Sequence, residues 1–368
     1  MKPLEQRLVD LMQRALAERV FSAASVLVGH RDTVVFSRCY GTTFFGQKAP
    51  LVTPSSLFDL ASLTKPIATA SLVMALVKEG RILLEDSLEH IFPFRFVPRD
   101  KRTLTVEQLL CHTSGLPAYK PYFRELIAVR PERRKDTLME WILREPLVSR
   151  PGTQRLYTDL GYMLLGWIVE EVSESPLDIL FDQRLRSHET SWRLGYRRLM
   201  AFSATDHLPE ASTRDTEPHD VCVATEHCPW RGRLLQGEVH DENAYCLNGV
   251  AGHAGLFGTA WDIWQWSQKL KDLFEPQWRL GFDVPNAHGS SAGRYFSPQT
   301  IGHLGFTGTS FWIDLDQHIT VILLTNRVHP DRHDDRIRSF RPLFHDTVME
   351  SVLGVEGASS WFYEGGFA

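Results

Sequence analysis

The segment Ser62-Leu63-Thr64-Lys65 holds a hydroxyl and an amine at the spacing of one helical turn. On a helix, side chains three residues apart share a face, with Cβ atoms roughly 5–6 Å apart, so the lysine amine can reach the serine oxygen. Apolar residues at helical spacing and a terminal glycine predict a helix over 62–80. Ser62 would then lie at the positive end of the helix dipole, where developing negative charge is stabilised. The pattern therefore predicts covalent serine chemistry, and the alternative is a serine that only caps the helix.

A second candidate is Tyr157, which follows the turn at Pro151 and Gly152 and precedes the apolar run 163–169. A phenol has an unperturbed pKa of about 10, but a nearby ammonium favours the phenolate. Tyr157 and Lys65 could therefore share one proton. The alternative is a tyrosine whose hydroxyl only anchors the turn.

A third segment, 302–314, and the apolar run 319–326 are predicted to be two adjacent strands joined by a tight turn at 314–317. Gly305 and Gly308 would permit close approach of a substrate to the strand and leave N–H groups free to bond it. The alternative is a bulged edge strand.

Together and in this order, the three segments resemble the serine β-lactamase and penicillin-binding-protein family, in its branch of class C β-lactamases, D-alanyl-D-alanine carboxypeptidases and esterases. Two further stretches, 109–117 and 249–257, look like hallmarks of the same family. The resemblance spans about residues 20–350. It implies a serine hydrolase that acts through an acyl-enzyme on an ester, an amide or a D-amino-acid peptide.

The resemblance also assigns roles to the residues of the motifs. Ser62 would be the acylated nucleophile, Lys65 its proton partner, and Tyr157 the general base and leaving-group acid. The backbone N–H groups of Ser62 and Phe306 would form the oxyanion hole. The residues that would bind substrate are Asp159, His303, Leu304 and Gly305. The expected partner is a small-molecule substrate, and neither a metal nor another cofactor is expected.

Two motifs depart from the pattern of typical β-lactamases. The tyrosine motif there ends in asparagine, whose amide donates to the substrate, whereas Asp159 can only accept hydrogen bonds when ionised. The strand motif there begins with lysine and threonine, whereas His303 and Leu304 supply a group that titrates near pH 6.5 and no hydroxyl. Weak β-lactam turnover is therefore expected. The alternatives to a serine hydrolase of the esterase or carboxypeptidase type are a true β-lactamase and a non-catalytic or covalent-sensor protein of this family.

The resemblance implies an α+β fold, with an antiparallel sheet flanked by helices and a mostly helical lobe. A single catalytic unit over 1–355 is expected, with its α/β part at about 1–60 and 250–355, its helical lobe at about 61–249, and an aromatic tail at 356–368. The sequence itself shows a strand-rich start, a helix-rich middle and a strand-rich end, which suits a layered α+β domain.

Hydrophobic spacing and proline and glycine punctuation predict the remaining elements. They are a hairpin over 20–41, helices over 1–12, 105–111, 136–143, 161–172, 261–274 and 335–353, and a short strand over 279–284. No element is predicted with any certainty over 173–233. The acidic segment 237–244 is either a pocket rim for a polar or cationic group or a solvated loop.

Composition narrows the classes of partner. A chain of 368 residues with 43% hydrophobic content can bury a large core. The net charge of −5 argues against nucleic acid as a partner, and no apolar run approaches the roughly 18–20 residues that span a bilayer. The charged first residues are unlike a secretory leader, so a cytoplasmic location is expected, or a periplasmic or extracellular one if the native start is missing. The sequence does not predict the oligomeric state.

The cysteines are odd in number and lack paired spacing, which is typical of a reducing compartment. They are Cys39, Cys111, Cys222, Cys228 and Cys246. A zinc site is the alternative in one region, because histidines and cysteines gather there at His219, Cys222, His227, Cys228, His240 and Cys246. The absence of a Cys-x-x-Cys pair argues against that site, and the serine motifs need no metal.

Overall fold

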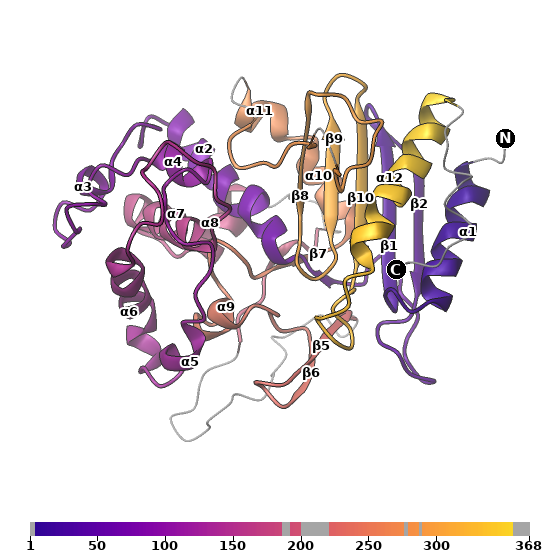
Figure 1. Ribbon diagram of the computed structural model, residues 1–368, viewed down its shortest axis with the longest axis horizontal. Coiled ribbons are helices and arrows are strands. Elements are labelled where there is room, and N and C mark those ends of the chain that lie inside the picture. Colours follow the sequence, from indigo (N-terminus) through magenta and orange to yellow (C-terminus); the bar gives the residue numbers. More distant parts are fainter. Residues whose placement is uncertain (1–3, 186–191, 200–220, 276–278, 287–288, 356–368) are drawn as a thin grey trace.

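A five-stranded antiparallel sheet brings together both ends of the chain (Figure 1). The computed structural model describes residues 4–185, 192–199, 221–275, 279–286 and 289–355. The strands, in spatial order, are β2 (Thr33–Gly41), β1 (Ala23–His30), β10 (Ile319–Thr325), β9 (Ser310–Asp314) and β8 (Thr300–Leu304). The register of β1 against β10 runs from Ala24 opposite Thr325 to His30 opposite Ile319. The predicted hairpin over 20–41 is confirmed as β1 and β2.

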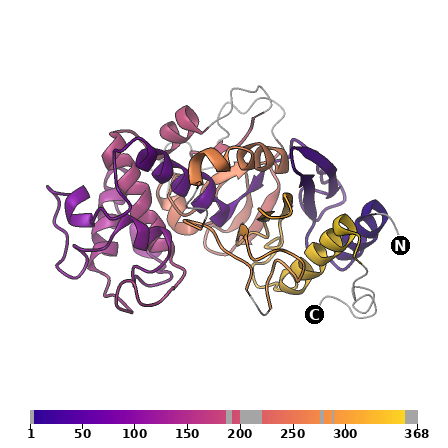
Figure 2. The same cartoon turned by 90° about the horizontal axis from the view of Figure 1, so that it is seen from above.

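Helices cover both faces of this sheet because side chains alternate along each strand. One face of β1 packs through Val26 and Val28 against α1 (Leu4–Ala17) and α12 (Ile337–Leu353). The other face packs against α10 (Ala260–Ser267), next to which α11 (Leu270–Phe274) lies. Figure 2 shows α1 and α12 side by side at one end of the molecule and the helical lobe at the other.

The lobe is built around α7 (Asp159–Ser173), whose residues 160–169 are all buried. The helices that surround it are α2 (Ser71–Lys78), α3 (Leu88–Ile91), α4 (Val106–Leu110), α5 (Phe123–Leu126), α6 (Pro131–Arg144), α8 (Leu177–Arg184) and α9 (Glu242–Cys246). Short strands lie between the lobe and the large sheet, namely β3 (Phe58–Asp59), β4 (Gly195–Tyr196), β5 (Ala224–Cys228), β6 (Arg233–Gln236) and β7 (Leu256–Gly258). The fold is therefore α+β, as the resemblance implied. None of the helices in the described ranges has the length and apolar character needed to cross a membrane.

The predicted helix over 62–80 is not one regular helix. A 3₁₀ turn (Ala61–Leu63) leads into a π-helix (Lys65–Ala70) and only then into α2. Pro66 has no N–H to donate, and the N–H of Ser71 bonds back to the Pro66 carbonyl five residues earlier. Such widened turns are rare and occur frequently at functional sites.

Three other predicted elements differ from the structure. The segment 302–314 is a hairpin and not one strand, because the backbone reverses between β8 and β9 around Gly308, whose φ is +113°. Residues 279–284 form only an isolated bridge, between Asp283 and Gly302. The predicted helix over 261–274 is split into α10 and α11. The helices predicted over 1–12, 105–111, 136–143, 161–172 and 335–353 correspond to α1, α4, α6, α7 and α12. The tail 356–368 lies outside the described residues.

Candidate active site

Lys65 lies beside Ser62, as the Ser-x-x-Lys spacing predicted, and its side chain is fully buried. Its Nζ atom donates to Ser62 Oγ at 2.8 Å and to the carbonyl of His253 at 3.3 Å, and it forms an ion pair with Asp159 Oδ1 at 2.8 Å. Burial alone would lower the pKa of Lys65, but the Asp159 carboxylate and Tyr157 outweigh it, and the pKa is raised. Lys65 is therefore an ammonium at neutral pH, and Asp159 supplies its counter-charge.

Tyr157 precedes α7 and lies against the same ammonium, which is 4.8 Å from the centre of its ring. The ring also contacts His112, at a centroid distance of 4.5 Å, and 38% of the tyrosine is exposed. Desolvation raises the pKa of Tyr157, Lys65 lowers it, and Asp159 raises it again, so the net direction is upward. The expected effect of Lys65 on the phenol is present but outweighed, and the resting site holds a neutral phenol beside an ammonium.

The backbone before Ser62 is held in an unusual conformation. Ala61 has φ of +48°, a region that non-glycine residues rarely occupy. The buried Asp59 stabilises it, because its Oδ1 accepts from the N–H of Ala61 at 2.8 Å while its Oδ2 accepts from the N–H of His240 at 2.6 Å. Burial raises the pKa of Asp59, which has no cationic side chain as a partner in these two bonds. This turn presents the Ser62 side chain to the cavity, and sequence reasoning did not identify Asp59.

The turn 305–309 between β8 and β9 faces Ser62. A Cβ on Gly305 would lie 2.0 Å from Thr309 Oγ1 and 2.7 Å from the Leu60 carbonyl oxygen. The glycine therefore allows close approach of the segment that carries Ser62, whereas the sequence suggested close approach of a substrate. The side chain of Phe306 in the same turn is half-exposed and lines the cavity.

His303 is buried and neutral. Its Nδ1 lies 2.9 Å from the Leu304 carbonyl oxygen, and within the described part of the chain its Nε2 has no hydrogen-bond partner. Burial lowers its pKa to about 4, an effect that nearby Asp283 opposes and Lys65 reinforces. The expectation of a group that titrates near pH 6.5 is therefore wrong for this site, because burial moves the titration into the acid range.

These side chains line one cavity of about 580 Å³. The predicted residues on its wall are Ser62, Tyr157, Asp159, His303, Leu304, Gly305 and Phe306, and Lys65 lies behind Ser62. Part of the acidic segment lines it too, through His240, Asp241 and Glu242. The structure therefore brings together every site residue that the sequence predicted.

Further charged groups complete the wall, two of them from the acidic segment 237–244 that the sequence offered as a pocket rim. Asp241 Oδ1 lies 2.9 Å from Nε2 of His253, and Glu242 forms an ion pair with Arg332 at 2.6 Å. Four arginines also line the cavity, namely Arg327 and Arg332 from the segment that leads into α12 and Arg338 and Arg341 from α12 itself. No local pattern marks these arginines, because only tertiary folding brings them to the same cavity as Ser62. His253, by contrast, lies within a stretch already noted as a family hallmark.

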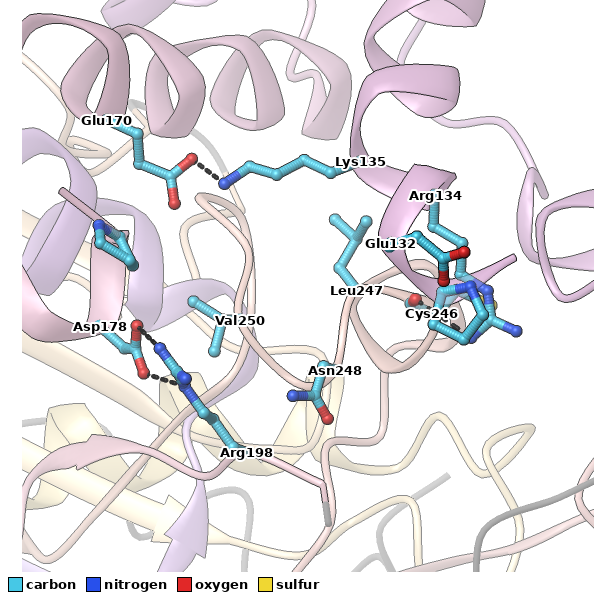
Figure 3. Close-up of a pocket in the computed structure, with 12 residues that line it drawn as sticks. Glu132, Arg134, Lys135, Glu170, Asp178, Arg198, Cys246, Leu247, Asn248 and Val250 are labelled. Carbon is cyan, nitrogen blue, oxygen red and sulfur yellow. Dashed lines mark hydrogen bonds and ion pairs between the residues drawn. The ribbon is translucent and has the colours of Figure 1, made fainter. Parts of the chain in front are cut away.

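A second cavity, of about 470 Å³, lies in the helical lobe (Figure 3). Four of its charged side chains form ion pairs, Lys135 with Glu170 and Arg198 with Asp178. Its one thiol, Cys246, has a pKa raised to about 12 by burial, so it is a poor nucleophile. Serine chemistry is therefore assigned to the first cavity.

The zinc alternative finds no support in the described residues. No group of three or more histidine, cysteine, aspartate or glutamate side chains is arranged there to hold a metal ion. His240 instead bonds to Glu226 at 2.8 Å, and His219 lies outside the described residues. The five cysteines are free thiols.

Comparison with known proteins identifies the family of this chain. The family model described as Beta-lactamase matches residues 8–341. A protein of Escherichia coli (strain K12) named "Putative D-alanyl-D-alanine carboxypeptidase" is 29% identical over 367 residues, covering 87% of this chain and 82% of that protein. An N-acetylmuramyl-L-alanine amidase of Bacillus subtilis (strain 168) is 33% identical over 314 residues, covering 74% and 68%.

A solved structure extends the likeness to the fold. The structure titled "EstCE1, a hydrolase with promiscuous acyltransferase activity" superposes with a TM-score of 0.65 at 21% identity, covering 94% of this chain and 98% of that one. The family model covers the sheet, the helical lobe and the cavity that holds Ser62, Lys65 and Tyr157. The chain belongs to the β-lactamase family of hydrolases.

Proposed function

We propose that this protein is a serine hydrolase that forms an acyl-enzyme on Ser62 and acts on an ester, an amide or a D-amino-acid peptide. The observation that carries the proposal is the 2.8 Å contact between Lys65 Nζ and Ser62 Oγ at the floor of the cavity. Nucleophilic catalysis by serine requires a proton acceptor within hydrogen-bond reach, and Lys65 and Tyr157 are the two candidates there.

Acylation begins when the pair of Lys65 and Tyr157 has lost one proton. The pair then takes the proton of the Ser62 hydroxyl while Oγ attacks the substrate carbonyl carbon. The N–H groups of Ser62 and Phe306 stabilise the oxyanion, as preorganised donors do in acyl transfer. Collapse of the tetrahedral intermediate breaks the bond to the leaving group, which receives its proton from Tyr157. Water then attacks the acyl carbonyl carbon and gives a proton to the pair of Lys65 and Tyr157. The bond between the acyl group and Ser62 Oγ breaks, Oγ regains its proton from the pair, and the acid product leaves.

The polar groups of the cavity bear on the choice of substrate. Asp159 is engaged by Lys65 and cannot donate to an acylamino carbonyl, and neutral His303 cannot supply a cation for a carboxylate at pH 7. A β-lactam that carries both groups would lose two anchors, each worth on the order of 1.5–3 kcal/mol. The carboxypeptidase and amidase named among the relatives support peptide or amide substrates. The resemblance to esterases supports small esters.

A panel of p-nitrophenyl esters, D-alanyl peptides and nitrocefin tests the proposal, with intact mass measured during turnover. We expect a mass increase equal to the acyl group on the parent and none on Ser62→Ala. The substitution should lower kcat by several orders of magnitude and leave the melting temperature nearly unchanged. Near-parental activity of Ser62→Ala on every substrate would overturn the assignment. Nitrocefin turnover comparable with the best ester would instead indicate a β-lactamase.

A further inference from the structure

Arg341 of α12 is a buried cation in the wall of the cavity, with 7% of its surface exposed. Its Nη2 donates to the carbonyl oxygens of Gly305 and Thr309, at 3.0 and 2.9 Å. Burial lowers its pKa to about 9, with a further contribution from Arg327, so it remains charged at neutral pH. Among the described residues it forms no ion pair with a carboxylate, and its Nε has no hydrogen-bond partner. A buried cation without a counter-charge is costly to a fold and calls for a compensating role.

The first carbonyl that Arg341 holds belongs to the peptide unit between Gly305 and Phe306. Among the described residues the one cis peptide bond precedes Pro330, so this unit is trans. In a trans peptide the C=O and the N–H point in opposite directions within one plane. Fixing the Gly305 carbonyl toward Arg341 therefore directs the Phe306 N–H away from α12.

The rest of the turn is held as firmly. Arg327 Nε donates to the Phe306 carbonyl at 2.8 Å, and Thr325 Oγ1 donates to the Gly308 carbonyl at 2.9 Å. Two threonine hydroxyls connect the turn to the segment before Ser62. They are Thr307 Oγ1, which donates to Asp59 O at 2.8 Å, and Thr309 Oγ1, which donates to Leu60 O at 3.1 Å. The Phe306 peptide is thereby fixed relative to Ser62.

We infer that Arg341 is a positioning residue that orients and polarises the Gly305–Phe306 peptide, so that its N–H stabilises the oxyanion formed at Ser62. The inference rests on the proposed function. A positive charge behind the carbonyl draws electron density along the peptide and strengthens the N–H as a donor. The benefit is largest when negative charge develops on the substrate oxygen, which is the condition for lowering the barrier.

The rival role for an arginine in this wall is direct binding of a substrate anion, and a pair of matched esters separates the two. We would measure kcat and KM with uncharged p-nitrophenyl butyrate and with p-nitrophenyl hydrogen succinate, which carries a carboxylate. Arg341→Met should lower kcat roughly 10- to 100-fold on both esters with little change in KM, below the ~100- to 1,000-fold loss from deleting an oxyanion donor. A loss confined to the carboxylate ester and expressed in KM would overturn the inference in favour of anion binding.

Two further variants keep the result interpretable. Arg341→Lys retains the charge, so it should recover part of the lost kcat on both esters even if the methionine variant folds poorly. Arg294→Met is the control. It removes a 2.8 Å ion pair with Asp346 of α12, the helix that also carries Arg341, but away from the cavity, so it should leave kcat unchanged. Ser62→Ala is assayed in parallel. If it is inactive while Arg341→Met and Arg341→Lys match the parent, the inference fails and the proposed function stands; if it is active, the proposed function fails.

Discussion

At Asp159 a carboxylate forms an ion pair with Lys65 where the β-lactamase pattern has an amide. The charge acts on both candidate bases, since it raises the pKa of Lys65 and that of Tyr157. Lys65 and Tyr157 are consequently both protonated in the resting site at neutral pH. Activity that depends on loss of one proton from the pair should therefore rise toward alkaline pH.

Asp159→Asn should move this alkaline rise to lower pH. Removing the negative charge lowers the pKa of both Lys65 and Tyr157, and the effect of a charge at this distance is roughly 1–3 units. A pH profile of kcat/KM with an uncharged ester measures the shift. Glu145→Gln, which removes an ion pair with Lys120 outside the cavity, should leave the profile in place. An unmoved or upward-shifted rise in Asp159→Asn would contradict the role of Asp159 as the counter-charge.

The sequence predicted most of the site at this scale, because Ser62 and Lys65 are neighbours along the chain. Tyr157, Asp159 and His303 followed from local motifs in known order. The ion pair of Asp159 and the low pKa of His303 could not be predicted, since both depend on burial and on partners from other segments.

Among the elements, the hairpin of β8 and β9 contacts the nucleophile segment through the turn 305–309. Gly305 makes that contact possible, because the space for its missing Cβ is taken by Thr309 Oγ1 and the Leu60 carbonyl oxygen. The close packing of Phe306 beside Ser62 therefore needs a residue without a side chain at position 305.

Gly305→Ala should separate the turn from the nucleophile segment. A displacement of about 1 Å at reacting groups can cost on the order of 100-fold, so we expect a loss of that size in kcat/KM on esters. Gly195→Ala in β4 is the matched control, because the nearest atom to its added Cβ is 3.8 Å away. Circular dichroism and thermal melting would show that both variants fold. Parental activity of Gly305→Ala would mean that the turn can shift without consequence.

Element prediction from the sequence succeeded where a segment's own pattern decided the outcome. The β1–β2 hairpin and α7 have such patterns. Prediction failed at 302–314, where apolar residues continue through a turn that the glycines allow. It also failed at 62–80, where Pro66 and the packing against the 249–257 loop produce a π-helix. Tertiary contacts, which no local window contains, decided both cases.

On the scale of the whole molecule, Glu226 of β5 joins segments that are distant in the chain. It bonds to His240 at 2.8 Å and to Arg332 at 2.7 and 2.6 Å, and Arg332 also bonds to Glu242. Burial alone would raise the pKa of Glu226, but His240 and Arg332 outweigh it and lower the pKa to about 2. Because the folded-state pKa is depressed, the network stabilises the fold above the ordinary value of 4.5. That stabilisation is lost as the pH falls through about 2.

Glu226→Gln should therefore destabilise the protein at neutral pH by on the order of 2–3 kcal/mol and much less near pH 2. Urea unfolding of the parent and the variant between pH 2 and 7 measures the difference. Glu85→Gln, at an exposed position, is the control and should give a small difference at every pH. A Glu226→Gln difference that stays constant across this range would show that the carboxylate charge does not stabilise the fold.

The pairing of β1 with β10 sets the order in which the protein can be completed during synthesis. Ala24 pairs with Thr325, which is synthesised roughly 300 residues later. The segment before Ser62 likewise contacts the turn 305–309, which is synthesised much later than Ser62. Until the ribosome has made β10, one edge of β1 has no partner strand, and such edges invite pairing with other chains. A nascent chain would therefore be a candidate for chaperone binding. It would acquire a competent nucleophile only after the turn 305–309 has been made and has folded against the segment before Ser62.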